Sequence, residues 1–357
     1  MVLVNLSILF DKPTGITTYA NNLVSQLKPL SPTLLIARSR PDFCCYPIPD
    51  NLSPAHGSKG HLRRLLWTQF KLPHIVRQCG SPLLFSPIPE APLYRNCRFV
   101  VMVHDLIPLR FPELFARSPL IPYFKYYIPQ VLAQSEHIIC NSEATARDII
   151  DFWQIPAAKI TPIPLACDRA HFQPCPTPRN EPPYFLYIGR HDPYKNVSRL
   201  IEAFARLRPS DSELRIAGSS DPRYTPALQE KVETLGLSGR VKFLEYVPYS
   251  QLPELLSNAI AFVFPSLWEG FGIPVLEAMA CGTPVITSNC SSLPEVAGDA
   301  ALLIDPYAVE EIATAMQQLW EDGEARSQLS RRSLERAQLF SWEKTGEETV
   351  KQLIVNG

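Results

Sequence analysis

Short apolar runs that alternate with helical patterns constrain the fold of this chain more than any other feature of its sequence. The rhythm occupies the first half of the chain and then returns in the second half. The strand-like runs lie at residues 3–10, 34–37, 83–85, 99–103 and 138–140, and then at 184–188, 214–217, 241–243, 259–264, 285–286 and 301–304. Alternating strands and helices are typical of a doubly wound parallel sheet, so we predict two α/β sheets in tandem.

The length of the chain and one change in composition predict where the domains divide. A chain of 357 residues exceeds one ordinary hydrophobic core, which indicates two domains of about 150 to 200 residues each. The proline-rich segment 172–183 is unsuited to regular structure, and we predict that it is the linker. The N-terminal domain is then 1–171 and the C-terminal domain 184–339. We expect the functional site in the cleft between them, at the carboxyl ends of the strands.

Charge and cysteine content exclude several classes of protein. The chain has 34 basic and 35 acidic residues and a formal net charge of −1, so bulk electrostatics gives no reason to expect a nucleic-acid partner. Its nine cysteines include no C-x-x-C pair and no zinc-ligand spacing, which favours reduced thiols. The sequence has no secretory signal, and no stretch approaches the roughly 18 uncharged apolar residues that span a bilayer. We therefore expect a cytoplasmic protein.

Two glutamates eight positions apart, Glu269 and Glu277, flank a turn that contains Gly270 and Gly272. The apolar run 259–264 predicts a strand before this turn, and the proline after it suits the start of a helix. We expect Glu277 in the first turn of that helix. Unpaired N–H groups at a helix start suit a phosphate or a sugar oxygen, and carboxylates accept hydrogen bonds from vicinal hydroxyls. This favours Glu269 for a sugar and Glu277 for a ribose, although an ordinary strand–loop–helix junction remains open from this segment alone.

A second polar loop follows the predicted strand 184–188 and carries Arg190, Lys195 and Asn196. Two cations at the carboxyl end of a strand suit a diphosphate, because Arg190 offers a fork of donors and Lys195 a point charge. The alternative is a solvated loop whose cations pair with nearby acids. We expect Asn196 to cap the following helix.

Two further positions complete the set of candidate site residues. Gly15 opens the helical segment 16–27 after the first strand, where its backbone can approach a ligand. The dinucleotide fingerprint G-x-G-x-x-G is absent, which counts against a dehydrogenase. His104 ends the strand 99–103, the usual position for reactive side chains, although a lone histidine there is often structural. We expect Asp105 to anchor its loop.

These motifs together resemble those of the retaining glycosyltransferases of family 4, which have the GT-B fold. The motif E-x7-E is present as Glu269 to Glu277, and the other matching segments fall in the order of the family. They are Pro13-Thr14-Gly15-Ile16, His104-Asp105-Leu106-Ile107-Pro108, Gly189-Arg190 with Lys195-Asn196, and Ala280-Cys281-Gly282-Thr283-Pro284-Val285-Ile286. The resemblance covers nearly the whole chain. It implies two Rossmann-like domains that face each other across a cleft, an acceptor domain at 1–171 and a nucleotide-sugar domain at 184–339. It also implies a last helix, 340–357, that crosses back to the N-terminal domain.

The resemblance also implies roles for the site residues. The catalytic group would be His104, Arg190, Lys195 and Glu269, with His104 beside the transferred sugar and Glu269 positioning it for a front-side substitution that retains anomeric configuration. The donor would be bound by Gly15, Arg190, Lys195, Gly270, Phe271, Gly272 and Glu277. No two aspartates lie two residues apart, so the metal-binding D-x-D signature is missing. We therefore expect no obligatory metal and no cofactor besides the nucleoside diphosphate sugar, which is a substrate.

The function implied is transfer of a hexose, with mannose or a related sugar favoured, from a nucleoside diphosphate sugar to a glycan or lipid-linked saccharide in polysaccharide biosynthesis. Two alternatives remain open, a nucleotide-sugar epimerase of similar architecture and an inactive sugar-nucleotide-binding scaffold.

The segment 59–77 is basic and also carries apolar residues at helical spacing. It predicts either peripheral contact with the inner face of a membrane, where it would meet a lipid-linked or anionic acceptor, or a core-packed helix with a charged outer face. Its basic residues are Lys59, His61, Arg63, Arg64, Lys71, His74 and Arg77, and its apolar ones include Leu62, Leu65, Leu66 and Phe70.

Overall fold

The chain divides into two compact units. The computed structural model describes residues 2–10, 14–80, 83–93, 97–116, 118–175, 182–208 and 211–357. One unit contains 1–165 together with 341–357, and the other contains 166–340. Residues 176–181 of the segment that the sequence analysis assigned to the linker lie outside the described residues.

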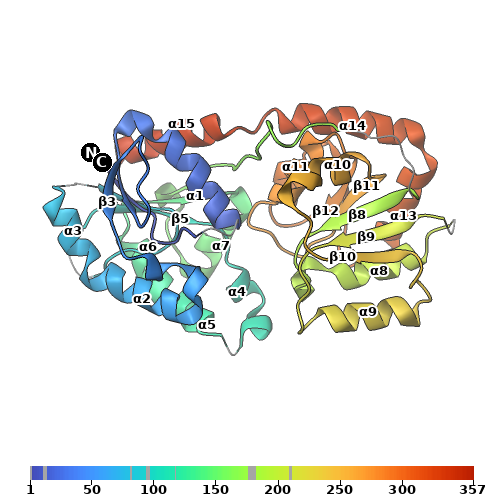
Figure 1. The fold of residues 1–357 in the computed structure, drawn as a ribbon, viewed down its shortest axis with the longest axis horizontal. Coiled ribbons are helices and arrows are strands. Elements are labelled where there is room, and N and C mark those ends of the chain that lie inside the picture. The colour runs from blue at the N-terminus through green and yellow to red at the C-terminus, as the bar shows by residue number, and fades with distance from the viewer. Residues whose placement is uncertain are drawn as a thin grey trace. The chain divides into compact units, whose positions relative to one another are not determined.

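The first unit is built on a parallel sheet of seven strands in the order β3-β2-β1-β4-β5-β6-β7 (Figure 1). The strands are β1 (Val2–Asn5), β2 (Thr33–Ile36), β3 (Cys44–Pro47), β4 (Leu83–Ser86), β5 (Phe99–Val103), β6 (His137–Cys140) and β7 (Ile160–Pro162). Every residue of β1, β4, β5 and β6 is buried, as expected for a parallel sheet covered on both faces. The strand order reverses between β1 and β4, which makes this the switch point of the sheet.

The helices of the first unit include one from the far end of the chain. They are α1 (Gly15–Gln26), α2 (Gly57–Phe70), α3 (Leu72–Gln78), α4 (Ile107–Arg110), α5 (Leu120–Pro122), α6 (Ile128–Gln134), α7 (Glu143–Trp153) and α15 (Trp342–Val355). Helix α15 packs beside α1, as Figure 1 shows in red and blue. The segment 59–77, which has apolar residues at helical spacing, forms two helices, α2 and α3, divided at Lys71, and α3 has a proline in its first turn.

The second unit repeats the same plan with six parallel strands in the order β10-β9-β8-β11-β12-β13. The strands are β8 (Tyr184–Ile188), β9 (Glu213–Ala217), β10 (Val241–Leu244), β11 (Ala261–Phe264), β12 (Val285–Ser288) and β13 (Ala301–Ile304). The helices are α8 (Val197–Ala205), α9 (Thr225–Thr234), α10 (Leu252–Ser257), α11 (Ile273–Ala280), α12 (Leu293–Ala297), α13 (Val309–Glu321) and α14 (Gly323–Ala337). Its switch point lies between β8 and β11.

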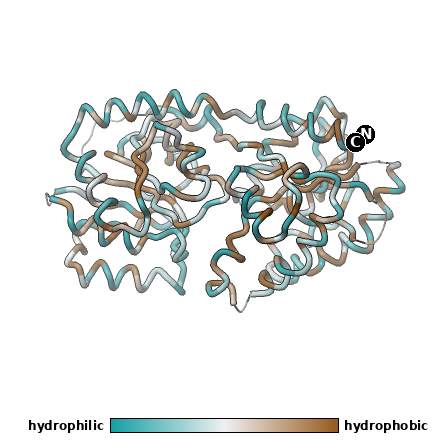
Figure 2. The backbone as a smooth tube through the Cα atoms, turned by 180° about the vertical axis from the view of Figure 1, so that it is seen from behind, coloured by the Kyte–Doolittle hydropathy of each residue, from teal (hydrophilic) through white to brown (hydrophobic). Residues whose placement is uncertain are grey.

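The two sheets confirm the predicted α/β class. In each unit the hydrophobic segments lie mainly toward the inside and the hydrophilic ones along the outer helices (Figure 2). Phe185 of β8 and Phe262 of β11 are fully buried, and so are Leu3 of β1 and Leu84 of β4. Burial of apolar side chains on both faces therefore stabilises each sheet. The connecting loops form its carboxyl edge.

Candidate functional site

Two loops meet at the switch point of the second sheet. Strand β8 pairs with β11, so that Phe185 lies opposite Ala261 and Leu186 opposite Phe262. Because the strands are parallel, the loops that follow them emerge at the same edge. These loops are 189–196 and 265–272, and they carry most of the residues that the sequence analysis selected.

Lys195 and Glu269 form an ion pair across this switch point. Lys195 Nζ donates to both carboxylate oxygens, at 2.7 and 3.0 Å. The side chains are only 14% and 10% exposed. The ammonium also lies 5.4 Å from the centre of the Phe264 ring. The structure thus brings together two residues to which the sequence analysis gave separate ligands.

Asn196 ties the two loops together. It has a left-handed backbone, with φ of 64°, and its amide nitrogen donates to the carbonyl oxygens of Pro265 at 3.0 Å and Pro306 at 2.6 Å. As expected, it occupies the N-cap position of α8, but its side chain makes no capping hydrogen bond to that helix. Its amide instead holds the turn that leads to Glu269.

Arg190 pairs with an acid on its own loop. Its Nε lies 2.7 Å from Asp192 Oδ2, and its Nη2 donates to Oδ1 at 2.9 Å. The Arg190 side chain is 67% exposed, whereas Asp192 is buried. The Tyr187 hydroxyl donates to the Arg190 carbonyl at 2.7 Å and so fixes the backbone here. Arg190 and Lys195, the two residues predicted to bind a diphosphate, are therefore each paired with a carboxylate in this structure. This is the ion pairing that the alternative interpretation of the loop described.

Serines that follow β12 hold the loop between the two glutamates. Ser292 Oγ lies 3.0 Å from the Glu269 carbonyl oxygen and 2.7 Å from that of Phe271, and the Glu269 N–H donates to Ser291 Oγ at 3.2 Å. The Phe271 ring is buried against Phe340, with centroids 6.0 Å apart. Sequence reasoning missed the role of these serines, for which the serine-rich run 288–292 was the available signal.

Gly272 starts the helix that carries Glu277. Its φ of 109° suits glycine, and a Cβ there would lie 2.8 Å from Leu293 Cδ2. Helix α11 begins at Ile273 with no acidic residue in its first turn, so the expectation that Glu277 lies in that turn is wrong. Glu277 lies in the second turn instead, where burial raises the pKa of its carboxyl to about 8.

His104 lies at the carboxyl edge of the first sheet, after β5. Its Nε2 lies 2.9 Å from the Pro87 carbonyl oxygen, and since a carbonyl only accepts, this nitrogen carries the hydrogen. Burial lowers the pKa of His104 to about 4. The neutral ring therefore leaves Nδ1 as an acceptor near pH 7. The Tyr19 ring of α1 packs edge-on against the imidazole, with centroids 5.0 Å apart.

The remaining candidates of the first unit lie in the same region of the sheet. Gly15 is the first residue of α1, and a Cβ there would meet no atom within 4 Å. Thr14 caps this helix together with Thr17, while Pro13 of the same motif lies outside the described residues. Asp105 Oδ1 accepts from the Ile107 N–H at 3.0 Å, which confirms that it anchors its loop.

Two parallel sheets in one chain, each with polar side chains at its carboxyl edge, agree with the GT-B architecture that the resemblance implied. Comparisons with known proteins agree with this class. The family model described as "Glycosyl transferases group 1" matches residues 170–336, and that described as "Glycosyltransferase Family 4" matches residues 13–171.

Two relatives make the match more specific. The O-antigen chain mannosyltransferase B of Escherichia coli is 34% identical over 269 residues, which cover 72% of this chain and 70% of that protein. The O-antigen chain mannosyltransferase RfbU of Salmonella typhimurium is 27% identical over 317 residues, 85% of this chain and 87% of the relative.

Solved structures show the same fold. Sucrose-phosphate synthase from Thermosynechococcus elongatus superposes with a TM-score of 0.78 at 20% identity, covering 100% of this chain and 99% of that one. WaaG, a glycosyltransferase involved in lipopolysaccharide biosynthesis, gives 0.73 at 16% identity over 98% of each chain. The chain therefore belongs to the group 1, family 4 glycosyltransferases of the GT-B fold.

Neither a membrane-spanning helix nor a metal-binding cluster occurs in the part of the chain that the structure describes. None of the helices among the described residues combines the length and hydropathy of a membrane crossing. Within the same residues, no three His, Cys, Asp or Glu side chains gather as a metal-binding group.

Proposed function

We propose that this glycosyltransferase moves a mannosyl residue from a nucleoside diphosphate sugar to a growing saccharide in polysaccharide biosynthesis, with retention at the anomeric carbon. The observation that carries the proposal is the Lys195–Glu269 pair at the switch point, four residues from the start of the helix that bears Glu277. The matched O-antigen mannosyltransferases support the sugar and the pathway class. The relatives are glycosyltransferases, which gives the epimerase alternative no support.

The cations would act on the leaving group. As the bond to the anomeric carbon breaks, negative charge grows on the diphosphate, and a nearly buried ammonium stabilises it more strongly than water does. Glu269 holds Lys195 in place before the donor arrives and then accepts hydrogen bonds from hydroxyls of the hexose. The exposed Arg190 would turn from Asp192 to the phosphate oxygens. Glu277 would accept from the ribose hydroxyls.

His104 would position the sugar and would not remove a proton. A base whose pKa is about 4 is a poor proton acceptor near pH 7. Its Nδ1 can instead accept a hydrogen bond from a hydroxyl of the transferred sugar. Deprotonation of the acceptor would then fall to the departing phosphate, as a front-side substitution requires.

The test is transfer by the purified protein with GDP-mannose, UDP-glucose and UDP-galactose, with a saccharide acceptor and with or without EDTA. We expect GDP-mannose to release nucleotide only when acceptor is present, and transfer from UDP-glucose or UDP-galactose instead would refute mannose as the sugar. We expect EDTA to have no effect because Arg190 and Lys195 supply the cationic charge. Loss of turnover with EDTA that magnesium restores would refute metal independence. Conversion of the donor without acceptor would favour an epimerase, and binding without turnover would favour a scaffold.

We also propose that α2 contacts the surface of an anionic membrane. Leu62, Leu66 and Phe70 recur four residues apart and are 58%, 51% and 60% exposed. The basic residues Lys59, which precedes this stripe, and Arg63, which lies within it, are also exposed. The alternative of a core-packed helix required these three apolar side chains to lie in the core, but they are exposed. An apolar stripe beside basic residues suits the surface of an anionic bilayer.

Sedimentation with vesicles tests this surface. Binding should be stronger to vesicles with phosphatidylglycerol than to pure phosphatidylcholine, and Leu62→Ser with Phe70→Ser should weaken it about tenfold or more. Leu235→Ser is the control, since Leu235 is 40% exposed in the second unit. If the double variant Leu62→Ser with Phe70→Ser binds the vesicles as strongly as Leu235→Ser does, the proposal is refuted.

A further inference from the structure

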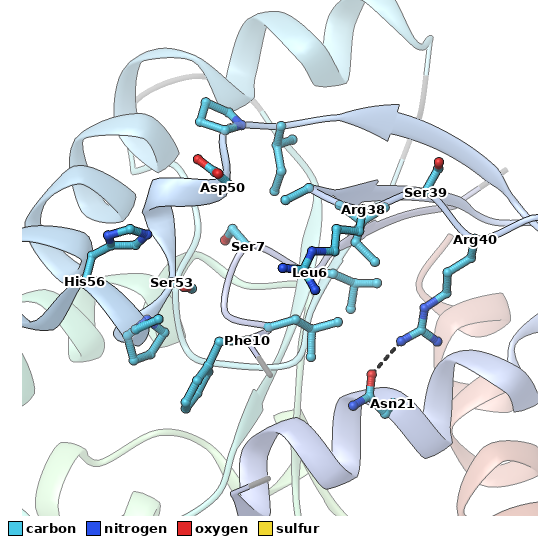
Figure 3. A pocket seen from close by; sticks show the side chains of 17 residues that line it. Leu6, Ser7, Phe10, Asn21, Arg38, Ser39, Arg40, Asp50, Ser53 and His56 are labelled. Carbon is cyan, nitrogen blue, oxygen red and sulfur yellow. Dashed lines mark hydrogen bonds between the residues drawn. The ribbon is translucent and has the colours of Figure 1, made fainter. Parts of the chain in front are cut away.

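A cavity of about 880 Å³ lies within the first unit, at the carboxyl ends of β1, β2 and β3. Its walls come from the segments that follow these strands, from the turn before α2 and from α1 (Figure 3). Ligands of open parallel sheets bind at this edge, and the volume is that of a site for a small ligand. None of the residues proposed to bind the donor lines it.

The charged groups of the cavity are mostly cationic. Arg38 and Arg40 follow β2, and Asp50, which follows β3, is the only acid that lines the cavity among the described residues. Figure 3 shows the Arg38 guanidinium directed toward the middle of the cavity. Arg40 donates to the side-chain oxygen of Asn21 on α1, which orders its guanidinium at the wall. Two guanidinium groups against one carboxylate favour an anionic ligand.

A buried hydroxyl at the wall supplies a second, independent indication of a ligand. Ser7 lines the cavity and is 4% exposed, yet its Oγ has no hydrogen-bond partner among the described residues. A buried polar group without a partner costs free energy, so such groups are normally paired. A ligand that enters the cavity can provide the missing partner.

The wall also has an apolar part. The side chains of Phe10, Leu6 and Ile36 also line the cavity. A flat apolar side chain beside hydroxyl, amide and guanidinium groups suits the mixed faces of a pyranose ring, with its C–H groups on one side and its hydroxyls at the edge. A free inorganic anion would leave this apolar part unused.

We propose that this cavity binds an acceptor sugar that carries a negative charge, a phosphate or a carboxylate. The proposal rests on the function proposed above, because it assigns the acceptor of the same reaction. Arg38 and Arg40 bind the anionic group, Ser7 and Asp50 bind hydroxyls, and Phe10 packs against the ring.

Direct binding to the full-length protein tests the cavity. The probes are mannose 6-phosphate, glucuronic acid and uncharged mannose, titrated by calorimetry. We expect one of the two anions to bind and mannose to bind at least about tenfold more weakly. Preference for the phosphate would indicate a sugar phosphate, and preference for the uronate an acidic sugar. Equal binding of mannose and both anions would overturn the proposal.

Variants locate the bound anion. Arg38→Gln and Arg40→Gln should each weaken the preferred anion about tenfold or more, and Ser7→Ala about fivefold. The exposed Arg331→Gln is the matched control and should change nothing. Arg38 and Arg331 are both exposed, so we expect neither substitution to change the stability of the fold. Unchanged affinity in Arg38→Gln and Arg40→Gln would overturn the assignment.

A donor-site variant separates this proposal from the proposed function. Lys195→Ala should lose nucleoside diphosphate binding and keep the affinity for the anionic sugar. If Lys195→Ala loses the anionic sugar as well, the sugar binds at the donor site and the cavity proposal fails. If the wild type binds the anionic sugar in the cavity but transfers nothing from any donor, the proposed function fails and the cavity remains a binding site.

Discussion

Lys195 and Glu269 depend on each other because both are nearly buried. Removing one partner of such a pair leaves the other charge in a poorly solvated site, which costs more than the pair itself contributes. We expect Lys195→Met to lower the free energy of unfolding by about 2 to 3 kcal/mol, and Lys195→Met with Glu269→Gln to recover most of that loss. Urea unfolding measures both.

Lys231→Met is the matched control for this pair. Lys231 binds Glu202 and Ser198, but the side chains of Lys231 and Glu202 are 30% and 36% exposed. Solvent therefore screens this pair, and the change should cost less than about 1 kcal/mol. If the double variant is less stable than Lys195→Met alone, the two charges do not depend on each other in this way.

Glu277 gives the stability of the protein a pH dependence of defined sign. Its pKa rises from 4.5 to about 8 in the folded chain, so between these values the folded state binds the proton more tightly than the unfolded state. Stability should therefore fall as the pH rises through this window. In Glu277→Gln this contribution should be missing, and the melting temperature should fall less between pH 5 and pH 8 than in the wild type. The exposed Glu230→Gln should keep the wild-type slope.

The residue types of the site were predictable from the sequence, but their partners were not. The spacing of Glu269, Gly272 and Glu277 indicates a turn between polar groups. That Glu269 pairs with Lys195 depends on β8 and β11 being neighbours, which no local pattern encodes. The same holds for Asn196, whose amide binds Pro265 and Pro306 although its position before a helix suggested a cap.

At the scale of elements, Gly218 fixes how closely the segment after β9 approaches the loop that carries Arg190. It follows β9 with φ of 157°, and a Cβ there would lie 2.0 Å from the Gly189 carbonyl oxygen. Because the clash is with backbone, Gly218→Ala must move the loop that carries Arg190. We expect a loss of about 2 to 4 kcal/mol in the free energy of unfolding and a lower rate of transfer.

Gly239→Ala is the control for this change, because a Cβ there meets no atom within 4 Å and its φ is ordinary. Thermal unfolding and initial rates of both variants check the prediction. A Gly218→Ala protein as stable and active as Gly239→Ala would mean that the loops can separate without cost.

The central strands were predictable and the edges of the first sheet were not. β1, β4, β5 and β6 are fully buried and read as continuous apolar runs. The edge strands β3 and β7 are partly exposed, and the sequence of β3, Cys-Cys-Tyr-Pro, has neither a clear apolar run nor a strict alternation. These two edge strands form because each pairs with a neighbouring strand, and no local sequence pattern predicts that pairing.

At the scale of the whole molecule, the two sheets were predictable because the strand and helix rhythm occurs twice. The packing of α15 on α1 was not predictable from this rhythm. Helix α15 is amphipathic, but its sequence does not state which surface it covers. The contact depends on Gly346, since a Cβ there would lie 2.2 Å from Gln26 Cβ. The Thr345 hydroxyl separately binds α15 to the segment after β7, because it donates to the Pro164 carbonyl oxygen at 2.7 Å.

Helix α15 should therefore stabilise the first unit selectively. Trp342 packs near Tyr19, with ring centroids 6.4 Å apart, and Tyr19 in turn packs against His104. We expect Gly346→Val to separate α15 from α1 and to reduce amide protection in α1 and around His104, while β8 and β11 keep theirs. Hydrogen exchange with mass spectrometry resolves these segments. The exposed Gly323→Val, at the start of α14, is the control. Equal loss of protection in both units after Gly346→Val would show that the chain unfolds as one cooperative whole, and unchanged protection in α1 would show that α15 does not stabilise the first unit.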